Sequence, residues 1–157
     1  MMTTSQFEIA LIEPEIPQNT GNIARLCAAT GTPLHLVGKL GFSLEDKYMR
    51  RAGLDYWPLV DLRVHPKIET FHKTVEGRRL VYTSTHGNVV YHKFDFKPRD
   101  ILVLGKESVG LPKELVENHE AAVLRIPVRD GVRSLNIGNA AGILLYEGLR
   151  QLGGGPE

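Results

Sequence analysis

The sequence predicts one α/β domain with a mostly parallel β-sheet flanked by helices. Short apolar runs alternate with amphipathic segments along the 157 residues, and such alternation is typical of βαβ units with parallel strands. The composition, 42% hydrophobic and 24% charged residues, is that of a globular domain able to bury its own core. We expect a single domain over residues 1–157, with its core at about 7–152 and a Gly-rich tail.

The first strand is predicted at residues 8–13, where an apolar run stops at Pro14. A helix follows from Asn19 or Thr20, both good N-caps, and ends before Gly31, which suits a left-handed C-cap. Further strands are predicted where apolar runs end in turn signals, and helices where the apolar period is longer. In the first half these are a strand at 34–37, a helix at 44–52, a strand at 58–62 and a helix at 66–75.

The second half continues the alternation and ends in the longest helix. Residues 89–96 fit neither period clearly and stay ambiguous. The predicted elements are strands at 79–84, 100–104 and 122–126 and helices at 112–118 and 134–151. Ligands of parallel sheets bind beyond the carboxyl ends of the strands, so the loops that follow these strands are the candidate site.

Composition excludes several classes of protein. The single cysteine, Cys27, excludes an internal disulfide, and its place on an apolar helix face predicts inert packing. A net charge of +1 gives no global attraction to nucleic acid, so any basic surface must be local. We expect no membrane segment and no secretory signal, and therefore a cytoplasmic location.

The stretch from Ile126 to Ala141 carries the clearest site signal. A strand stops at Pro127, a polar loop follows, and a helix opens at Ser134 to Asn136. Exposed backbone N–H groups at a helix start suit a bound ligand. Asn136 and Asn139 are three residues apart, which places them on one helix face. They could equally satisfy helix and loop backbone groups.

A second candidate lies where Glu107 stands between Gly105 and Gly110. Glycines let the backbone approach a ligand closely, although a solvated surface carboxylate is an equally open interpretation. The segment is not a phosphate-binding P-loop, because the required earlier glycine is replaced by Asp100. The six histidines are scattered along the sequence, and with one cysteine we expect no metal site.

Three segments resemble, in this order, the sequence motifs of the SPOUT RNA methyltransferases. They are Pro14–Arg25, Leu104–Pro112 and, in the third motif, Ile126–Pro127 with Arg133–Ala140. Within that superfamily the chain is similar to the small tRNA (cytidine/uridine-34)-2′-O-methyltransferases, and residues 50–56 are typical of that group. The resemblance implies methyl transfer from S-adenosyl-L-methionine to the ribose 2′-hydroxyl of the wobble nucleotide, position 34, of tRNA.

The resemblance also implies a fold and a cofactor pocket. The fold is an α/β-knot, a parallel sheet with a deep C-terminal trefoil knot, which strand patterns alone would not suggest. No metal is implied. Residue-by-residue transfer of the motifs assigns the cofactor contacts to Thr83, Leu104, Gly105, Ile126, Ser134 and Leu135.

The family works as a homodimer on the anticodon stem-loop of tRNA. The resemblance assigns catalytic roles to Arg25, supplied by the partner subunit, and to Glu107, Ser134, Asn136 and Asn139. It assigns RNA contacts to Asn22, Arg25, Lys47, Arg50 and Arg51. Arg25 could instead form a surface salt bridge, and the basic cluster could be a solvated helix face.

Two positions depart from the family pattern, and two other functions stay open. Lys106 stands where many relatives have a small residue or Pro, and Gly138 replaces a common serine. Gly138, Gly142 and Gly148 weaken the last helix but could permit close packing of two copies. The alternatives are a catalytically silent RNA-binding dimer and a 2′-O-methyltransferase acting on ribosomal RNA.

Overall fold

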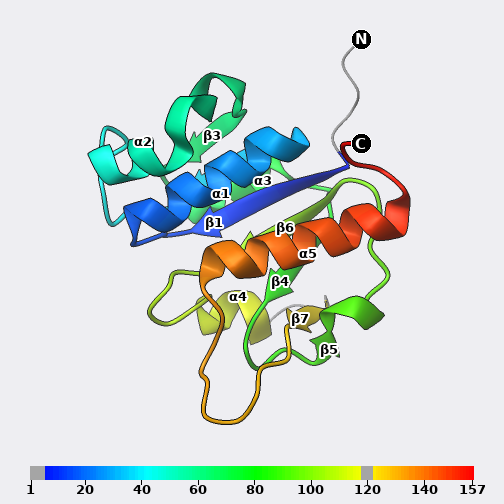
Figure 1. Ribbon diagram of the computed structural model, residues 1–157. Coiled ribbons are helices and arrows are strands. Elements are labelled where there is room, and N and C mark those ends of the chain that lie inside the picture. Colours follow the sequence, from blue (N-terminus) through cyan, green and yellow to red (C-terminus); the bar gives the residue numbers. More distant parts are fainter. Residues whose placement is uncertain (1–5, 118–121) are drawn as a thin grey trace.

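The computed structural model describes residues 6–117 and 122–157, and within them seven strands form one sheet (Figure 1). Its order is β3-β2-β1-β6-β4-β7-β5, and every pair of neighbouring strands is parallel. The strands are β1 Phe7–Ile12, β2 Leu34–Val37, β3 Leu62–His65, β4 Leu80–Thr83, β5 Val89–Val90, β6 Asp100–Leu104 and β7 Val123–Arg125. The predicted α/β class with a parallel sheet is confirmed.

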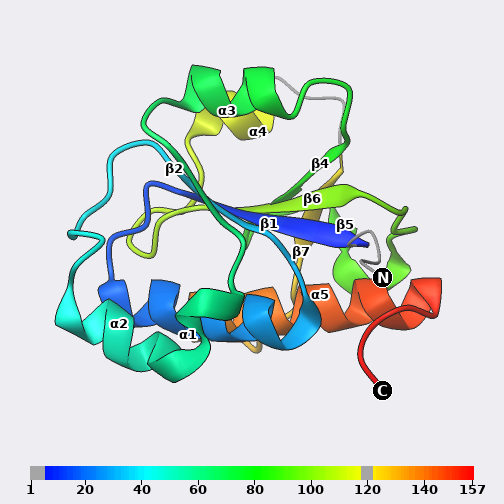
Figure 2. The same cartoon turned by 90° about the horizontal axis from the view of Figure 1, so that it is seen from above.

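Helices cover both faces of this sheet, as Figure 2 shows. The α-helices are α1 Pro17–Thr30, α2 Lys47–Gly53, α3 Ile68–Thr74, α4 Lys113–Glu117 and α5 Ile137–Leu152. Two 3-10 helices, η1 Leu54–Leu59 and η2 Tyr91–Lys93, complete the described elements. One face carries α1, α2 and α5, and the other carries α3 and α4. Asn118, predicted as the end of α4, lies outside the described residues.

The central strands are buried along their whole length because helices pack on both sides. All residues of β1, β2 and β6 are buried, which explains why their sequences read as nearly continuous apolar runs. Alternate residues of β1 point to opposite cores: Ile9 packs with Ile23 and Leu144, while Ala10 packs with Phe71 of α3.

Helix ends differ from the prediction by a few residues. Helix α1 begins at Pro17 rather than at Asn19, since proline suits the first turn of a helix. It ends as predicted at Gly31, whose φ of 68° is left-handed. Helix α5 begins after Asn136, whose side chain accepts hydrogen bonds from the N–H groups of Gly138 and Asn139.

The predicted strand at 58–62 is wrong. Residues 54–59 form η1, and the strand is β3, which begins at Leu62. Trp57 explains the error, because its indole N–H donates to the carbonyl of Arg50 at 3.1 Å. Its ring lies over Gly53, where an added Cβ would come within 2.5 Å of it. Tertiary packing on α2 therefore overrides an apolar run that resembles a strand.

Two glycines of α5, Gly142 and Gly148, lie in different surroundings. A Cβ at Gly148 would lie 2.7 Å from the ring of Phe7, so this glycine allows close packing within the chain rather than between copies. A Cβ at Gly142 would have nothing within 4 Å, and this position remains open toward the outer surface.

Candidate functional site at the carboxyl edge of the sheet

Glu107 ties the loop after β6 to the start of α1. Its Oε2 accepts a hydrogen bond from the N–H of Glu15 at 2.8 Å, and its Oε1 accepts one from the N–H of Ile16 at 3.1 Å. Helix α1 has no side-chain cap of its own at Ile16. A carboxylate from 91 residues away thus satisfies N–H groups at the positive end of the helix dipole.

Glu15 returns the contact in the opposite direction. Its carboxylate accepts from the N–H of Ser108 at 3.0 Å and from the Ser108 hydroxyl at 2.6 Å. These hydrogen bonds lower the pKa of Glu15 from its ordinary value. The loops after β1 and β6 therefore hold each other through reciprocal pairs, although sequence patterns pointed to neither Glu15 nor Ser108.

Asn19 joins the third motif to the other two. Its side-chain N–H₂ donates to Oε1 of Glu107 at 3.4 Å, and its carbonyl oxygen accepts from the side chain of Asn136 at 3.0 Å. Asn19 is only 8% exposed, so both hydrogen bonds shield a polar group that burial would otherwise penalise. We call Glu15, Asn19, Glu107, Ser108 and Asn136 the carboxyl-edge network.

Asn19 was missed as a site residue because it was predicted to be an N-cap. Proline at the first helical position was the signal that could have corrected this, since it moves the helix start to Pro17. Asn19 then falls inside the first turn, and its buried side chain is free to reach across to Glu107 and Asn136.

The predicted cofactor residues lie at the ends of three adjacent strands. Thr83 ends β4, Leu104 ends β6 and Ile126 follows β7, and these strands are neighbours in the order β6-β4-β7. Leu104 is buried, whereas the hydroxyl of Thr83 donates to the carbonyl of Val103 at 3.1 Å. A Cβ at Gly105 would lie 2.2 Å from the backbone of Gly110, so only glycine permits this fold of the loop.

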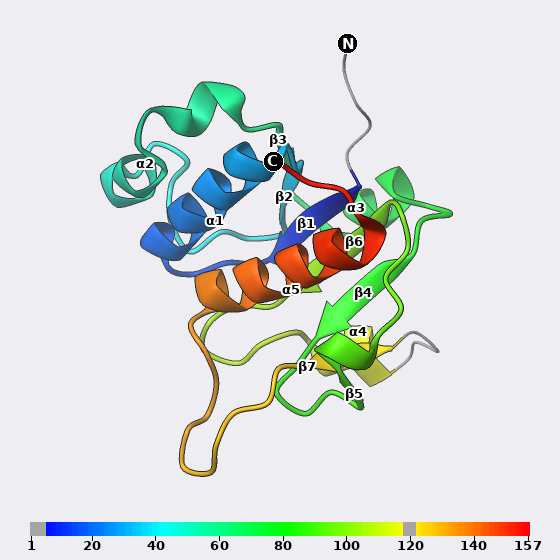
Figure 3. The ribbon, with the colours of Figure 1, turned by 45° about the vertical axis from the view of Figure 1, so that its right-hand side comes forward.

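Ser134 and Leu135 lie in the loop between β7 and α5, which projects away from the body of the molecule (Figure 3). Both are exposed, and Leu135 shows 37% of its surface. Asn139 is also exposed on the first turn of α5. Within the described chain no hydrogen bond joins the Ser134 or Asn139 side chain to another group, so only Asn136 of the third motif enters the network.

The predicted RNA-contacting residues fall on α1 and α2. Asn22 and Arg25 are exposed on the outer side of α1, and the Arg25 guanidinium lies 5.4 Å from the centre of the Tyr56 ring. Arg51 is exposed, and Lys47 lies 5.1 Å from the ring of Tyr48.

Arg50 is held more firmly than its neighbours. Its Nε donates to the carbonyl of Leu44 at 2.8 Å, and its guanidinium stacks 5.0 Å from the ring of Trp57. These contacts indicate a structural part in fastening α2 to the loop before it and to η1.

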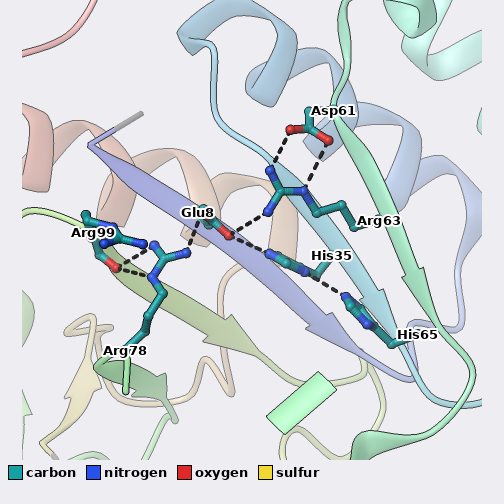
Figure 4. Close-up of polar contacts among 7 residues, drawn as sticks. All are labelled: Glu8, His35, Asp61, Arg63, His65, Arg78 and Arg99. Carbon is teal, nitrogen blue, oxygen red and sulfur yellow. Dashed lines mark hydrogen bonds and ion pairs between the residues drawn. The ribbon is translucent and has the colours of Figure 1, made fainter. Parts of the chain in front are cut away.

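A second polar cluster lies inside the sheet rather than at its edge. Glu8, His35 and His65 lie on neighbouring strands β1, β2 and β3 and form a hydrogen-bonded row, which we call the buried ladder (Figure 4). Strand pairing brings together two histidines that are 30 residues apart, a proximity that sequence spacing did not reveal. The row packs against Phe71 of α3.

Among the described residues, no group of three or more His, Cys, Asp or Glu side chains is placed to hold a metal ion. In the same part of the chain, no helix combines the length and apolar character needed to cross a membrane. A cavity of about 300 Å³ is lined by Gly77–Arg79 and Lys97–Asp100. It lies at the amino ends of β4 and β6, whereas the carboxyl-edge network lies at the other end of the sheet.

Proteins named as tRNA methyltransferases are similar to this chain over nearly its whole length. A tRNA (cytidine(34)-2′-O)-methyltransferase of Methylovorus glucosotrophus is 47% identical over 146 residues, covering 92% of this chain and 95% of the relative. One of Saccharophagus degradans is 47% identical over 148 residues, covering 94% and 96%.

Solved structures agree with these relatives. A structure from work on the 2-OH methylation of C/U34 on tRNA matches with a TM-score of 0.90 at 44% identity, covering 94% of this chain and 96% of that one. The SpoU methyltransferase AviRb of Streptomyces viridochromogenes, in complex with AdoMet, matches with a TM-score of 0.86 at 26% identity, covering 97% and 60%. The model of the SpoU rRNA methylase family matches residues 6–146, and the chain belongs to that family.

Proposed function

We propose that the protein transfers a methyl group from S-adenosyl-L-methionine to the ribose 2′-hydroxyl of nucleotide 34, a cytidine or uridine, of tRNA. The observation that carries this proposal is the near full-length match, at 47% identity, to relatives named for that reaction. The carboxyl-edge network supports it, because it gathers the three family motifs at one end of the sheet. Such an enzyme would act in the cytoplasm.

The residues at this edge fit S-adenosyl-L-methionine. Among the described residues, the backbone of 127–135 makes one backbone–backbone hydrogen bond, from the N–H of Val132 to the carbonyl of Arg129, so its other amides and carbonyls are available to a ligand. Val128, Val132 and Leu135 expose 37 to 48% of their surfaces on this loop, and a nucleoside would cover such apolar side chains. Backbone groups near Thr83, Gly105 and Ile126 would hold the cofactor, which supplies an electrophilic methyl group.

The chain's own task is alignment of the ribose hydroxyl and help with its charge. Arg25 cannot act as a simple base, because guanidinium stays protonated and has no acceptor lone pair. It would orient the 2′-oxygen and the adjacent phosphate and stabilise developing negative charge on that oxygen. The proton would pass to a phosphate oxygen or to water. Ser134 and Asn139 would add orienting hydrogen bonds, since their side chains are exposed at the edge.

Glu107 and Asn136 would act at one remove from the reaction. Both side chains are occupied, Glu107 by the N–H groups before α1 and Asn136 by the N–H groups of α5. They would hold the loops of the second and third motifs in place rather than touch the reacting atoms.

We also propose that the active unit is a homodimer in which Arg25 serves the partner's site. Helices α1 and α5 lie side by side on the same face of the sheet (Figures 1 and 3). On the outside of α5, Tyr146 is 50% exposed and Gly142 leaves open space. An aromatic residue beside a small one suits a helix packed against a second copy. The anticodon stem-loop would then contact Asn22, Lys47 and Arg51.

The C-terminal third is proposed to form the trefoil knot of the family. The loop from β4 to β5, residues 84–88, lies across β7, which sits between those two strands in the sheet. The N–H of Ser84 donates to the carbonyl of Leu124, and a Cβ at Gly87 would meet the Val123 carbonyl at 2.5 Å. This close crossing supports a chain that threads beneath the loop before it reaches α5.

In the decisive experiment, the purified protein is incubated with labelled S-adenosyl-L-methionine and either bulk tRNA or ribosomal RNA. The methylated nucleotide is then mapped. We expect label at nucleotide 34 of tRNA. Label in ribosomal RNA alone would make the protein a ribosomal enzyme. Binding of tRNA without cofactor binding, measured by calorimetry, would make it a silent RNA-binding module.

A further inference from the structure

We propose that Tyr56 is a positioning residue that holds the Arg25 guanidinium ready for the substrate. The inference rests on the proposed function, in which Arg25 acts on the ribose and phosphate of the target nucleotide. Arg25 lies on α1 and Tyr56 on η1, and the guanidinium carbon is 5.4 Å from the ring centre. This separation is within the range of a cation–π contact.

The ring contact leaves the donors of Arg25 free. Within the described part of the chain, no hydrogen bond or ion pair involves the Arg25 side chain, and its guanidinium lies over the Tyr56 ring. A carboxylate partner would restrict the same side chain but would occupy the N–H fork that a phosphate or alkoxide needs. An aromatic face restricts the arginine and keeps its N–H groups available.

In two other arginine–aromatic pairs, the guanidinium group is also hydrogen-bonded, unlike that of Arg25. Arg50 lies over Trp57, but its Nε already donates to the carbonyl of Leu44. Arg79 lies over Phe94, and its guanidinium is bonded to Asp100. Those two guanidinium groups make hydrogen bonds that stabilise the fold. The guanidinium of Arg25 is stacked on a ring, but its N–H groups make no hydrogen bond within the described chain.

Tyr56 is itself carried by a well-anchored turn. The adjacent Trp57 donates its indole N–H to the Arg50 carbonyl, and the N–H of Val60 donates to the Trp57 carbonyl, both at 3.1 Å. The Tyr56 side chain is 39% exposed, so it lies at the surface where RNA can reach the stacked guanidinium. A fixed ring on a fixed turn reduces the freedom that Arg25 would otherwise lose on binding substrate.

The test compares Tyr56→Leu with Tyr56→Phe at saturating tRNA and cofactor. Leucine removes the aromatic face, and we expect kcat to fall about fivefold, the size of an exposed cation–π contact, with the cofactor KM unchanged. Phenylalanine keeps the face and should restore the wild-type kcat. Tyr48→Leu is the matched control, because Tyr48 is also an exposed tyrosine beneath a cation, Lys47, and its loss should leave kcat unchanged.

Two further measurements separate positioning from other roles. In an Arg25→Ala background, Tyr56→Leu should cause no further loss of single-turnover rate; an equal loss there would overturn the inference. Nitrogen-15 relaxation of the Arg25 Nε–H group needs no RNA: we expect it to be rigid in the wild type and, in Tyr56→Leu, as mobile as Arg51. Unchanged mobility would also overturn the inference, whereas absence of tRNA methylation by the wild type would instead refute the proposed function.

Discussion

The buried ladder and the carboxyl-edge network both join distant segments through polar side chains. They differ in how far their polar groups are buried and hydrogen-bonded. In the ladder, His35 is fully buried, and Glu8 and His65 are 8% and 7% exposed. Nε2 of His35 bonds Glu8 at 2.6 Å, and Nδ1 of His35 bonds His65 at 2.8 Å. Buried polar groups must be paired, and each of these three side chains has a hydrogen-bond partner within the row.

Charge in the ladder is balanced as well. Arg78 and Arg63 both approach the Glu8 carboxylate (Figure 4). Burial alone would raise the pKa of Glu8, but hydrogen bonds from His35 and Arg78 lower it to about 2. Burial and the nearby His35 and Arg63 lower the pKa of His65.

The carboxyl-edge network is completed only in part. Asn19 is hydrogen-bonded to both Glu107 and Asn136. Ser134 and Asn139, in contrast, are exposed and have no side-chain hydrogen-bond partners in the described chain. A closed network stabilises the fold, and a network with open groups at its rim can receive a ligand. We therefore expect ladder variants to change stability and edge or surface variants to change turnover or binding.

The largest expected effect comes from Arg25→Lys, which keeps the charge but removes the planar fork. Loss of an oriented donor to developing charge should lower kcat about 100-fold, with the unfolding free energy unchanged. Single-turnover methylation and urea denaturation measure the two quantities. Near-normal turnover would refute the positioning role of Arg25. A large loss of stability would contradict the expectation that surface variants change turnover and ladder variants change stability.

Glu8→Gln tests the opposite side of the comparison. It leaves Arg78 and His35 without their anion, so we expect about 3 kcal/mol lower unfolding free energy at pH 7, with kcat of the folded protein unchanged. Glu76→Gln, an exposed carboxylate, is the control and should cost little. Equal stability of Glu8→Gln and the wild type would show that the ladder contributes nothing.

The same variant has a defined pH dependence. The pKa of Glu8 falls from 4.5 to about 2 on folding, so its contribution is present above about 4.5 and is lost as the pH drops toward 2. The difference between wild type and Glu8→Gln should therefore shrink over that window. His65, whose pKa is lowered from 6.5, adds a loss of stability that begins at higher pH. Urea titrations at several pH values measure both.

Glu107→Gln should give an intermediate effect that lowers both the unfolding free energy and the cofactor affinity. An amide replaces one of the two oxygens that accept from the N–H groups of Glu15 and Ile16, at a cost of about 1–2 kcal/mol. Because the loop at Gly105 loses a tether, cofactor affinity measured by calorimetry should also fall. Glu114→Gln on the exposed side of α4 is the control. Normal affinity in Glu107→Gln would separate this carboxylate from the cofactor site.

The smallest effect is expected from Arg51→Gln. This exposed arginine makes no hydrogen bond or ion pair within the described chain, so its guanidinium can contact a phosphate. Its loss should flatten the slope of log affinity for tRNA against log salt concentration by about one unit. Arg50→Gln should leave that slope nearly unchanged and lower stability instead, since Arg50 is bonded to Leu44 and stacked on Trp57. The reverse pattern would exchange the two assignments.

The sequence alone determined the alternation of strands and helices and the parallel sheet. It could do so because burial period and turn residues are local signals, as at β1, β6 and Gly31. It also carried the three motifs that resemble the family. It failed at 58–62, where packing of Trp57 on α2 decided a 3-10 helix.

The tertiary structure decided which distant groups meet. Periodicity reports the face on which a residue lies, but sheet order and register determine its neighbours. Only the pairing of β2 with β3 brings His35 to His65, and only the meeting of the loops after β1 and β6 brings Glu107 to Glu15 and Asn19. The Arg25–Tyr56 stack depends in the same way on how η1 packs beside α1.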